Sequence, residues 1–324
     1  MLKKTILLLA IALALAVPCF AWAQATALVS SEKDNTLTVV NLKEQKVEGT
    51  IATCKRPRHV QLSADGKQVL VACGGDNAAD VIDVATRKSV GRIPLGDNPE
   101  AFDLSPDGKM LYVSNEDEGE LTFIDIAGKK AVKEVKVGKE PEGVKVSPDG
   151  KTVYVTSEVA SMVHVIDTTS AKVVKNIVVG KRPRRMAVTP DGAELWVTNE
   201  LGASVSIIST KDLKVIGTVK FAIKGAKSSD ITPVGIVISK DGKRAFVGLG
   251  RANHVAFVDV AKREVTQQVL AGKRAWNLVL SRDESQLYVV NGLSDDMTVV
   301  DVATAKASKT IPVGRVPYGA VLID

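Results

Sequence analysis

Seven positions at regular spacing along the chain include side chains that could hold a ligand. Proline precedes six of them and alanine the seventh; the seven residues are Arg58, Glu100, Glu142, Arg184, Val234, Trp276 and Tyr318. Guanidinium groups hold carboxylates through paired hydrogen bonds, and aromatic rings add flat apolar contact area. If the fold gathers these residues, they predict a site for a small anionic ligand or a protein partner, with Arg58, Glu100, Glu142, Arg184, Trp276 and Tyr318 as its binding residues.

Other chemistries lack the residues they need. The histidines His59, His164 and His254 lie far apart in the sequence, which argues against a shared metal site. The sequence contains neither a Cys-x-x-Cys-His haem motif nor a Gly-x-Ser-x-Gly nucleophile motif. We therefore predict no catalytic residue, no metal site and no bound cofactor.

A repeated turn organises these positions. Leu104–Asn115 reads as an alternating apolar run, an Asp-Gly turn and a second alternating run, which is a strong hairpin signal. Related turns recur with spacings of 42, 42, 42, 50 and 42 residues, at Asp65, Asp107, Asp149, Asp191, Asp241 and Asp283. A period of about forty residues with four strands per unit is typical of a β-propeller.

The strands of one unit can be read as A to D, from the central axis outward. In the third unit they are Glu142–Ser147, Thr152–Ser157, Val163–Asp167 and Val173–Gly180. Strand C phrases number seven although the turns number six. The N-terminal Ala27–Ser31 matches strand B, and Tyr318–Asp324 matches strand A, so we predict that they pair in a shared seventh blade. The prediction is an all-β, seven-bladed propeller with four-stranded antiparallel blades, occupying residues 26–324 as a single domain.

The longer spacing comes from an insertion in Phe221–Ile231. Its polar composition favours a solvated excursion, and a functional lid is the alternative.

The N-terminus has the pattern of a secretory signal peptide. Lys3 and Lys4 precede an apolar stretch, and small residues suitable for cleavage follow near Ala23 and Ala25. We expect residues 1–25 to be removed and the rest to be exported to the periplasm without membrane insertion. The formal net charge is +6, and without the two lysines it becomes +4, which gives no reason to expect nucleic-acid binding.

Two cysteines remain after such cleavage, Cys54 and Cys73. They flank the first Asp-Gly turn at similar distances, so antiparallel pairing brings both to the same rim. An oxidising compartment favours a disulfide between them, and two free thiols are the alternative.

The repeats resemble a known family. Tyr112-Val113-Ser114-Asn115, Tyr154-Val155-Thr156-Ser157 and Trp196-Val197-Thr198-Asn199, with the Ser-Pro-Asp-Gly turns, resemble YVTN-family β-propellers. The chain looks most like the subgroup associated with pyrroloquinoline quinone (PQQ)-dependent catabolism. That resemblance implies a periplasmic binding or scaffold accessory of quinoprotein alcohol oxidation, with no catalytic residues to transfer. The runner-up is a hydrolase, because lactonases resemble the same repeat. A quinoprotein dehydrogenase is disfavoured because only Trp196 and Trp276 follow the signal peptide.

In this blade order, the seven positions begin the innermost strands and should line the mouth of the axial channel. The preceding loops add further cations, among them Arg56, Arg182 and Arg274, and Glu32, Glu116, Glu158 and Glu200 follow strand B nearby. We expect these glutamates to neutralise the basic loops and the mouth side chains to be exposed. The alternative is that the charges only solvate loops and form weak ion pairs.

Overall fold

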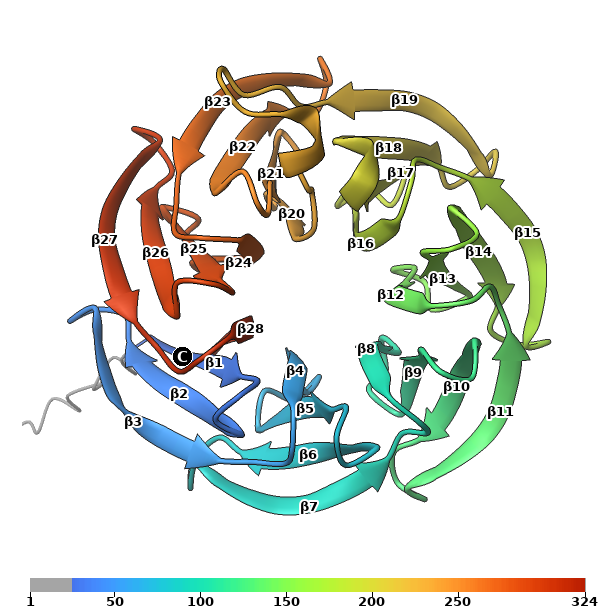
Figure 1. The fold of residues 1–324 in the computed structure, drawn as a ribbon. Coiled ribbons are helices and arrows are strands. Elements are labelled where there is room, and N and C mark those ends of the chain that lie inside the picture. Colours follow the sequence, from blue (N-terminus) through green and yellow to red (C-terminus); the bar gives the residue numbers. More distant parts are fainter. Residues whose placement is uncertain (1–24, 324) are drawn as a thin grey trace, which may run out of the picture.

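The computed structural model describes residues 25–323. Its strands form seven four-stranded antiparallel sheets arranged around a central axis (Figure 1). The predicted seven-bladed propeller is therefore confirmed. Apart from Ala25, the expected signal peptide lies outside the described residues. Within residues 25–323 the structure contains no helix long and apolar enough to span a membrane.

Each blade has its strands in the order A to D from the axis outward (Figure 1). Blade 1 consists of β4 (Pro57–Leu62), β5 (Gln68–Cys73), β6 (Ala78–Asp83) and β7 (Lys88–Pro94). Blade 2 consists of β8 (Pro99–Leu104), β9 (Met110–Asn115), β10 (Glu120–Asp125) and β11 (Lys130–Lys136). Blade 3 consists of β12 (Pro141–Val146), β13 (Thr152–Ser157), β14 (Met162–Asp167) and β15 (Lys172–Val178). Blade 4 consists of β16 (Pro183–Val188), β17 (Glu194–Asn199), β18 (Ser204–Ser209) and β19 (Lys214–Lys220).

The remaining blades complete the ring. Blade 5 consists of β20 (Ile236–Ile238), β21 (Arg244–Gly248), β22 (His254–Asp259) and β23 (Glu264–Leu270). Blade 6 consists of β24 (Ala275–Leu280), β25 (Gln286–Asn291), β26 (Asp296–Asp301) and β27 (Lys306–Pro312). Blade 7 consists of β28 (Pro317–Ile323), β1 (Thr26–Ser31), β2 (Thr36–Asn41) and β3 (Lys46–Ala52). Two short 3₁₀ helices are η1 (Glu200–Gly202) and η2 (Ser228–Asp230).

Blade 7 joins the two ends of the chain, as predicted. Strand β1 pairs antiparallel with β28, with Leu28 opposite Val321 and Ala27 opposite Leu322. Because the last innermost strand is bonded to the first strand of the chain, this pairing closes the ring without leaving an unpaired strand edge inside the blade.

The apolar core lies between neighbouring blades. Strand β9 is buried on both faces, since its Tyr112 packs in one cluster with Val153 and Val155 of the next blade. The outer strands are different: β11 is exposed except for Val135. The near-continuous apolar reading of strands B and C, and the polar reading of strand D, follow from these two environments.

The repeated turn is stabilised by its own side chains. In blade 2, Ser105 Oγ donates to Asp107 Oδ1 (2.6 Å), and Asp107 accepts from the Lys109 backbone N–H (3.1 Å). Gly108 adopts φ +69°, a conformation that side chains disfavour. The serine hydrogen bond and the backbone N–H together hold the pKa of Asp107 below its usual value.

The insertion is a solvated excursion. Residues 224–229 are exposed, whereas Phe221 and Ile231 at its ends are buried in the core between blades 4 and 5. Packing is therefore confined to Phe221, Ile231 and the partly buried Ile223, and the rest of the segment is largely exposed.

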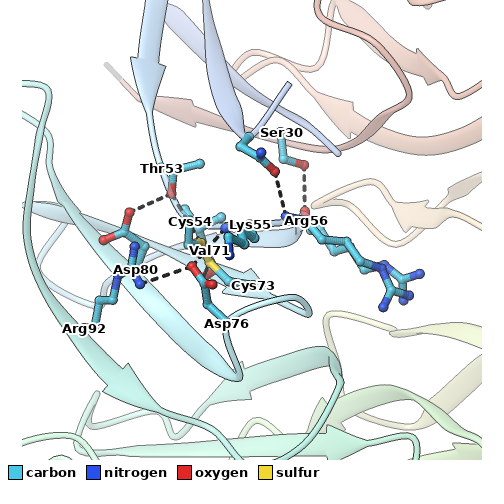
Figure 2. The surroundings of a disulfide bond; sticks show 12 residues. Ser30, Thr53, Cys54, Lys55, Arg56, Val71, Cys73, Asp76, Asp80 and Arg92 are labelled. Atoms are coloured by element: carbon cyan, nitrogen blue, oxygen red, sulfur yellow. Dashed lines mark hydrogen bonds and ion pairs between the residues drawn. A yellow bond between two sulfur atoms is a disulfide. The ribbon is translucent and has the colours of Figure 1, made fainter. Parts of the chain in front are cut away.

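A disulfide joins Cys54 and Cys73 beside the rim that carries the loops into strand A (Figure 2). Their Cα atoms are 5.8 Å apart, and both side chains are buried. Asp76, just after Cys73, accepts from the Lys55 backbone N–H (3.0 Å), which ties the same two segments together. The bond thus links the loop into β4 with the end of β5.

We expect the disulfide to be present in exported protein and to stabilise it. For a sequence separation of 19 residues, reduction should lower the free energy of unfolding by about 3 kcal/mol. A thiol assay in denaturant should find no reactive thiol before reduction. The Cys54→Ala, Cys73→Ala double variant is the control, because its melting temperature should not respond to reductant. Two titratable thiols in unreduced exported protein would contradict this prediction.

Candidate functional site

The first residues of the innermost strands meet at one end of the axis. A cavity of about 260 Å³, which we call the mouth cavity, is lined by Arg58, Glu100, Glu142, Arg184, Trp276 and Tyr318, among others. These six residues come from β4, β8, β12, β16, β24 and β28, so the fold brings together all the binding residues proposed from the sequence. Val234 instead packs beneath, against Trp276 and Tyr318.

Hydroxyl groups of strand B fix the backbone of these residues. Each donates to a carbonyl oxygen in the next blade; the pairs are Ser30 to Arg58 (2.6 Å), Ser114 to Glu142 (2.9 Å), Thr156 to Arg184 (2.8 Å) and Thr198 to Val234 (2.8 Å). We call this set the hydroxyl frame. These hydroxyl groups belong to the Tyr-Val-Thr-Asn type phrase from which the family resemblance was inferred, and no positioning role was predicted for them from the sequence. The recurring hydroxyl at its third position was the signal for this positioning role.

Gly143 allows two strands that the hydroxyl frame connects to approach each other closely. A Cβ atom on Gly143 would collide with the Arg184 carbonyl oxygen, so strands β12 and β16 approach closely there. The Gly143 N–H donates to Thr156 Oγ1 (2.7 Å), the same hydroxyl that binds Arg184. The side chains of Glu142 and Arg184 are thereby held next to each other.

Arg184 is surrounded by carboxylates. Its Nη2 lies 3.2 Å from Glu142 Oε1, its Nη1 pairs with Glu158, and its Nε lies 3.7 Å from Glu200 Oε2. Arg182 pairs with the same two outer glutamates, at 2.8 Å from Glu158 and 2.9 Å from Glu200. Those outer glutamates therefore neutralise the basic loop, as expected.

A second ionic group lies across the mouth. Glu32 Oε1 lies 3.1 Å from Arg56 Nε and 3.3 Å from Arg58 Nε, and Arg58 also pairs with Glu100. Arg58 and Glu100 thus form an ion pair with each other, and both also line the mouth cavity. Within residues 25–323, no group of three or more His, Cys, Asp or Glu side chains is arranged to hold a metal ion.

Tyr318 closes the floor of the mouth cavity. Its hydroxyl accepts from Arg185 Nη2 (2.6 Å) and can donate to Glu142 Oε1 (3.3 Å) or Glu100 Oε2 (3.4 Å). Arg185 also donates to the Glu142 carbonyl oxygen (3.2 Å). These hydrogen bonds join Tyr318, Arg185 and Glu142 into a layer across the axis, which we call the closing layer.

The expectation of exposed mouth side chains is wrong. Arg184 is only 7% exposed and Trp276 only 4%. Arg182 pairs with Glu158, which also pairs with Arg184, and Arg274 lies against the indole ring of Trp276, so these loop side chains help to shield Arg184 and Trp276 from solvent. Removing the side chain of Arg184 or of Trp276 will therefore cost folding stability. A binding test cannot assume that such variants keep the fold unchanged.

Burial and charge shift the pKa values of the carboxyl groups in different directions. Burial would raise the pKa of Glu142, but Arg184, Arg185 and Arg58 together hold it below its usual value. Burial raises the pKa of Glu158 to about 7, against the opposing effect of Arg184. Burial, with the charge of Glu142, also raises the pKa of Glu116, which lines the mouth cavity.

Arg274 differs from the other mouth arginines. Its guanidinium carbon lies 3.8 Å from the centre of the Trp276 ring, and among the described residues no carboxylate lies within ion-pair distance of it. Burial lowers its pKa, the charge of Glu200 partly opposes this from beyond ion-pair distance, and the charge of Arg184 acts in the same direction as burial. The buried indole Nε1 of Trp276 has no hydrogen-bond partner in the structure. This corner of the mouth cavity therefore contains a cation and a donor that the protein itself leaves unpaired.

Comparison with known protein families agrees with this architecture. The YNCE-like β-propeller family matches residues 67–146, and the seven-bladed β-propeller lactonase family matches residues 169–314. The chain is a seven-bladed β-propeller. The arylesterase family also matches residues 112–212 of the propeller. A search of curated proteins finds no significant match.

Solved structures share the propeller fold at low sequence identity. A functionally unknown protein from Desulfotomaculum acetoxidans is 16% identical with a TM-score of 0.76, covering 92% of this chain and 98% of its own. The dihydro-heme d1 dehydrogenase NirN is 16% identical with a TM-score of 0.69, covering 91% and 74% respectively. Hydrazine synthase of Kuenenia stuttgartiensis is 23% identical with a TM-score of 0.55, covering 76% and 96%. At these identities the likeness concerns the fold alone.

Proposed function

We propose that this propeller is a non-enzymatic binding protein whose mouth cavity holds a small organic carboxylate. Arg274 and Trp276 anchor the ligand, while Arg58, Glu100, Glu142, Arg184 and Tyr318 form the charged walls and floor. The unpaired guanidinium of Arg274 is the observation that carries this proposal. A half-buried cation without a counter-ion is costly, and a bound carboxylate supplies that counter-ion together with charge-assisted hydrogen bonds.

The distribution of charge favours an anion at Arg274. The residues that line the mouth cavity include five arginines and four glutamates, and the four glutamates are Glu32, Glu100, Glu116 and Glu142. Glu158 and Glu200 also pair with Arg182 and Arg184, so Arg274 is the lining arginine for which the described residues provide no ion-pair partner. The Trp276 ring supports a flat apolar portion beside the carboxylate, and its unpaired N–H is a further donor that a ligand oxygen could satisfy.

The cellular setting proposed here rests on the sequence. Residues 1–25 act as the signal peptide, and residues 26–324 form one exported domain in the periplasm. The resemblance to PQQ-associated propellers supports a role as an accessory of quinoprotein alcohol oxidation, with the carboxylate or a periplasmic protein as the partner.

A lactonase-like hydrolase is the second candidate. The lactonase and arylesterase matches favour it, and together they span much of the propeller. In the mouth cavity, Glu116 is the carboxyl group with a raised pKa, as a general base working near neutral pH requires. It would activate water to attack an ester carbonyl, while Arg274 stabilises the developing oxyanion.

Calorimetric titration with benzoate tests the binding proposal. We expect Arg274→Met to weaken benzoate binding at least about tenfold, because it removes a charge-assisted contact. The matched control is Lys273→Met, which removes the adjacent exposed cation and should leave the affinity unchanged. Equal affinity in wild type and Arg274→Met would place the site elsewhere.

The same preparations separate the two candidates. Wild-type protein should not hydrolyse phenyl acetate or δ-valerolactone above the buffer rate if the protein only binds. Turnover that Glu116→Gln abolishes, without loss of benzoate binding, would instead establish the hydrolase.

A further inference from the structure

The axis contains a second cavity beyond the closing layer. This inner cavity, of about 230 Å³, lies farther along the innermost strands and is lined by residues that include His59, Gln61, Asp103, Lys145 and Arg185. Arg185 donates to Tyr318, which lines the mouth cavity, so the closing layer separates the two spaces. Lys145 is 36% exposed, so it marks a place where the inner cavity reaches solvent.

The polar side of the inner cavity carries no uncompensated charge. Lys145 Nζ lies 2.8 Å from Asp103 Oδ2, and Arg185 pairs with Glu142 at 3.3 Å. His59 stays uncharged, because burial and the charge of Arg185 lower its pKa to about 3. A charged ligand would therefore find no free counter-ion in the inner cavity, in contrast to the mouth cavity with its Arg274.

One acceptor on this side is unsatisfied. Gln61 donates through Nε2 to Asp103 Oδ1 (2.9 Å), which fixes the orientation of its amide. The buried Oε1 of the same amide has no hydrogen-bond partner of good geometry, although the amide lies close enough to the His59 ring to oppose the lowering of that ring's pKa. A buried acceptor without a donor is unfavourable, and a hydroxyl group of a ligand would supply that donor.

The opposite side of the inner cavity is largely apolar, apart from Asn277, whose Nδ2 donates to the Tyr318 carbonyl oxygen (2.9 Å). Ile236, Leu278 and Ala320 come from blades 5, 6 and 7, whereas Gln61, Asp103 and Lys145 come from blades 1, 2 and 3. Phe102 also lines the cavity and meets the His59 ring edge-on, with ring centres 4.8 Å apart. The cavity thus has one hydrogen-bonding side and one hydrocarbon side, and its volume suits a compact molecule.

We propose that the inner cavity is a second binding site, independent of the mouth cavity, for a small uncharged alcohol. The hydroxyl binds Gln61 Oε1, and the hydrocarbon part lies against Ile236 and Leu278. Both sites can be filled at once, because the hydrogen bonds of Tyr318 with Arg185 and Glu142 lie between the two cavities and need not break.

Three related probes test the ligand class: benzyl alcohol, toluene, which lacks the hydroxyl, and benzoate, which carries a charge. In calorimetric or ligand-detected NMR titrations of the purified protein, benzyl alcohol should bind at least about fivefold more tightly than toluene. Saturating benzoate should not displace it. Equal binding of benzyl alcohol and toluene, or competition by benzoate, would overturn the proposal.

Two variants locate the site. Gln61→Leu should reduce benzyl alcohol to the affinity of toluene, and Ala320→Leu should exclude both by filling the cavity. Each must still bind benzoate as wild type does, which shows that the propeller is folded. Arg274→Met is the reverse control, because it should leave benzyl alcohol binding unchanged. If Gln61→Leu and Ala320→Leu both retain full benzyl alcohol binding, the alcohol lies elsewhere and the assignment is wrong.

Discussion

A chain that ends at Pro317 is expected to be largely unfolded at physiological temperature and to show no cooperative thermal transition above it. The deletion of residues 318–324 removes the partner of β1, and with it the buried Tyr318 and Ile323. Each buried large side chain contributes about 1.5–3 kcal/mol, and β1 becomes an open edge at the same time. Because a domain is stable by only about 5–15 kcal/mol, the loss is comparable to the whole.

Thermal denaturation followed by circular dichroism measures this effect. The control is an equal deletion of residues 224–230 in the insertion, which are largely exposed and should be removable with a small change in melting temperature. If the truncated chain melts at the same temperature as the full one, closure through β28 does not support the fold.

The second large effect concerns the buried cation of the mouth. Arg184→Met should lower the free energy of unfolding by about 3 kcal/mol, at the low end for a broken buried ion pair, because Glu142 and Glu158 lose their shared partner and keep only Arg185 and Arg182. Arg315→Met is the matched control, since Arg315 pairs with Asp34 while 68% exposed and its loss should cost at most about 1 kcal/mol. Urea unfolding of the two variants gives the comparison.

The loss in Arg184→Met should depend on pH. In wild type, the arginines keep the pKa of Glu142 low, so ionised Glu142 adds stability above its unfolded pKa. Without Arg184, burial prevails and the pKa values of Glu142 and Glu158 rise, so ionising them costs stability as the pH increases. The variant should therefore be less impaired at pH 5 than at pH 8. Adding Glu158→Gln should recover about 0.5–3 kcal/mol at pH 8, and no recovery would show that the carboxylate is not the cause.

The architecture could be predicted because the turn and strand motifs that define a blade are local in sequence and recur at a nearly constant period. The Asp107-Gly108 turn and its relatives gave the period, and the match of Ala27–Ser31 to strand B gave the closure. The position after each loop proline also predicted which residues meet at the mouth, since repeat-equivalent positions must lie on one ring.

The state of those side chains could not be predicted in the same way. Burial of Arg184 depends on Glu158 and Glu200 reaching it from separate loops, and no periodicity encodes such a contact. In the sequence, Arg274 does not differ from the other loop cations, because its distance from every described carboxylate and its contact with Trp276 depend on the folded structure. The inner cavity depends on side-chain volumes at one to three further positions of each innermost strand, which a repeat pattern does not specify.

The hydroxyl frame has a consequence for how such proteins diversify. Ser114 and Thr156 bind the carbonyl oxygens of Glu142 and Arg184, so they place the backbone without contacting the two side chains, which form ion pairs of their own. A new side chain at one of these positions would therefore inherit a backbone already placed at the axis by the neighbouring blade. A single substitution could therefore change the ligand specificity of the mouth cavity, while the hydroxyl groups of strand B, which do not line that cavity, keep the backbone in place.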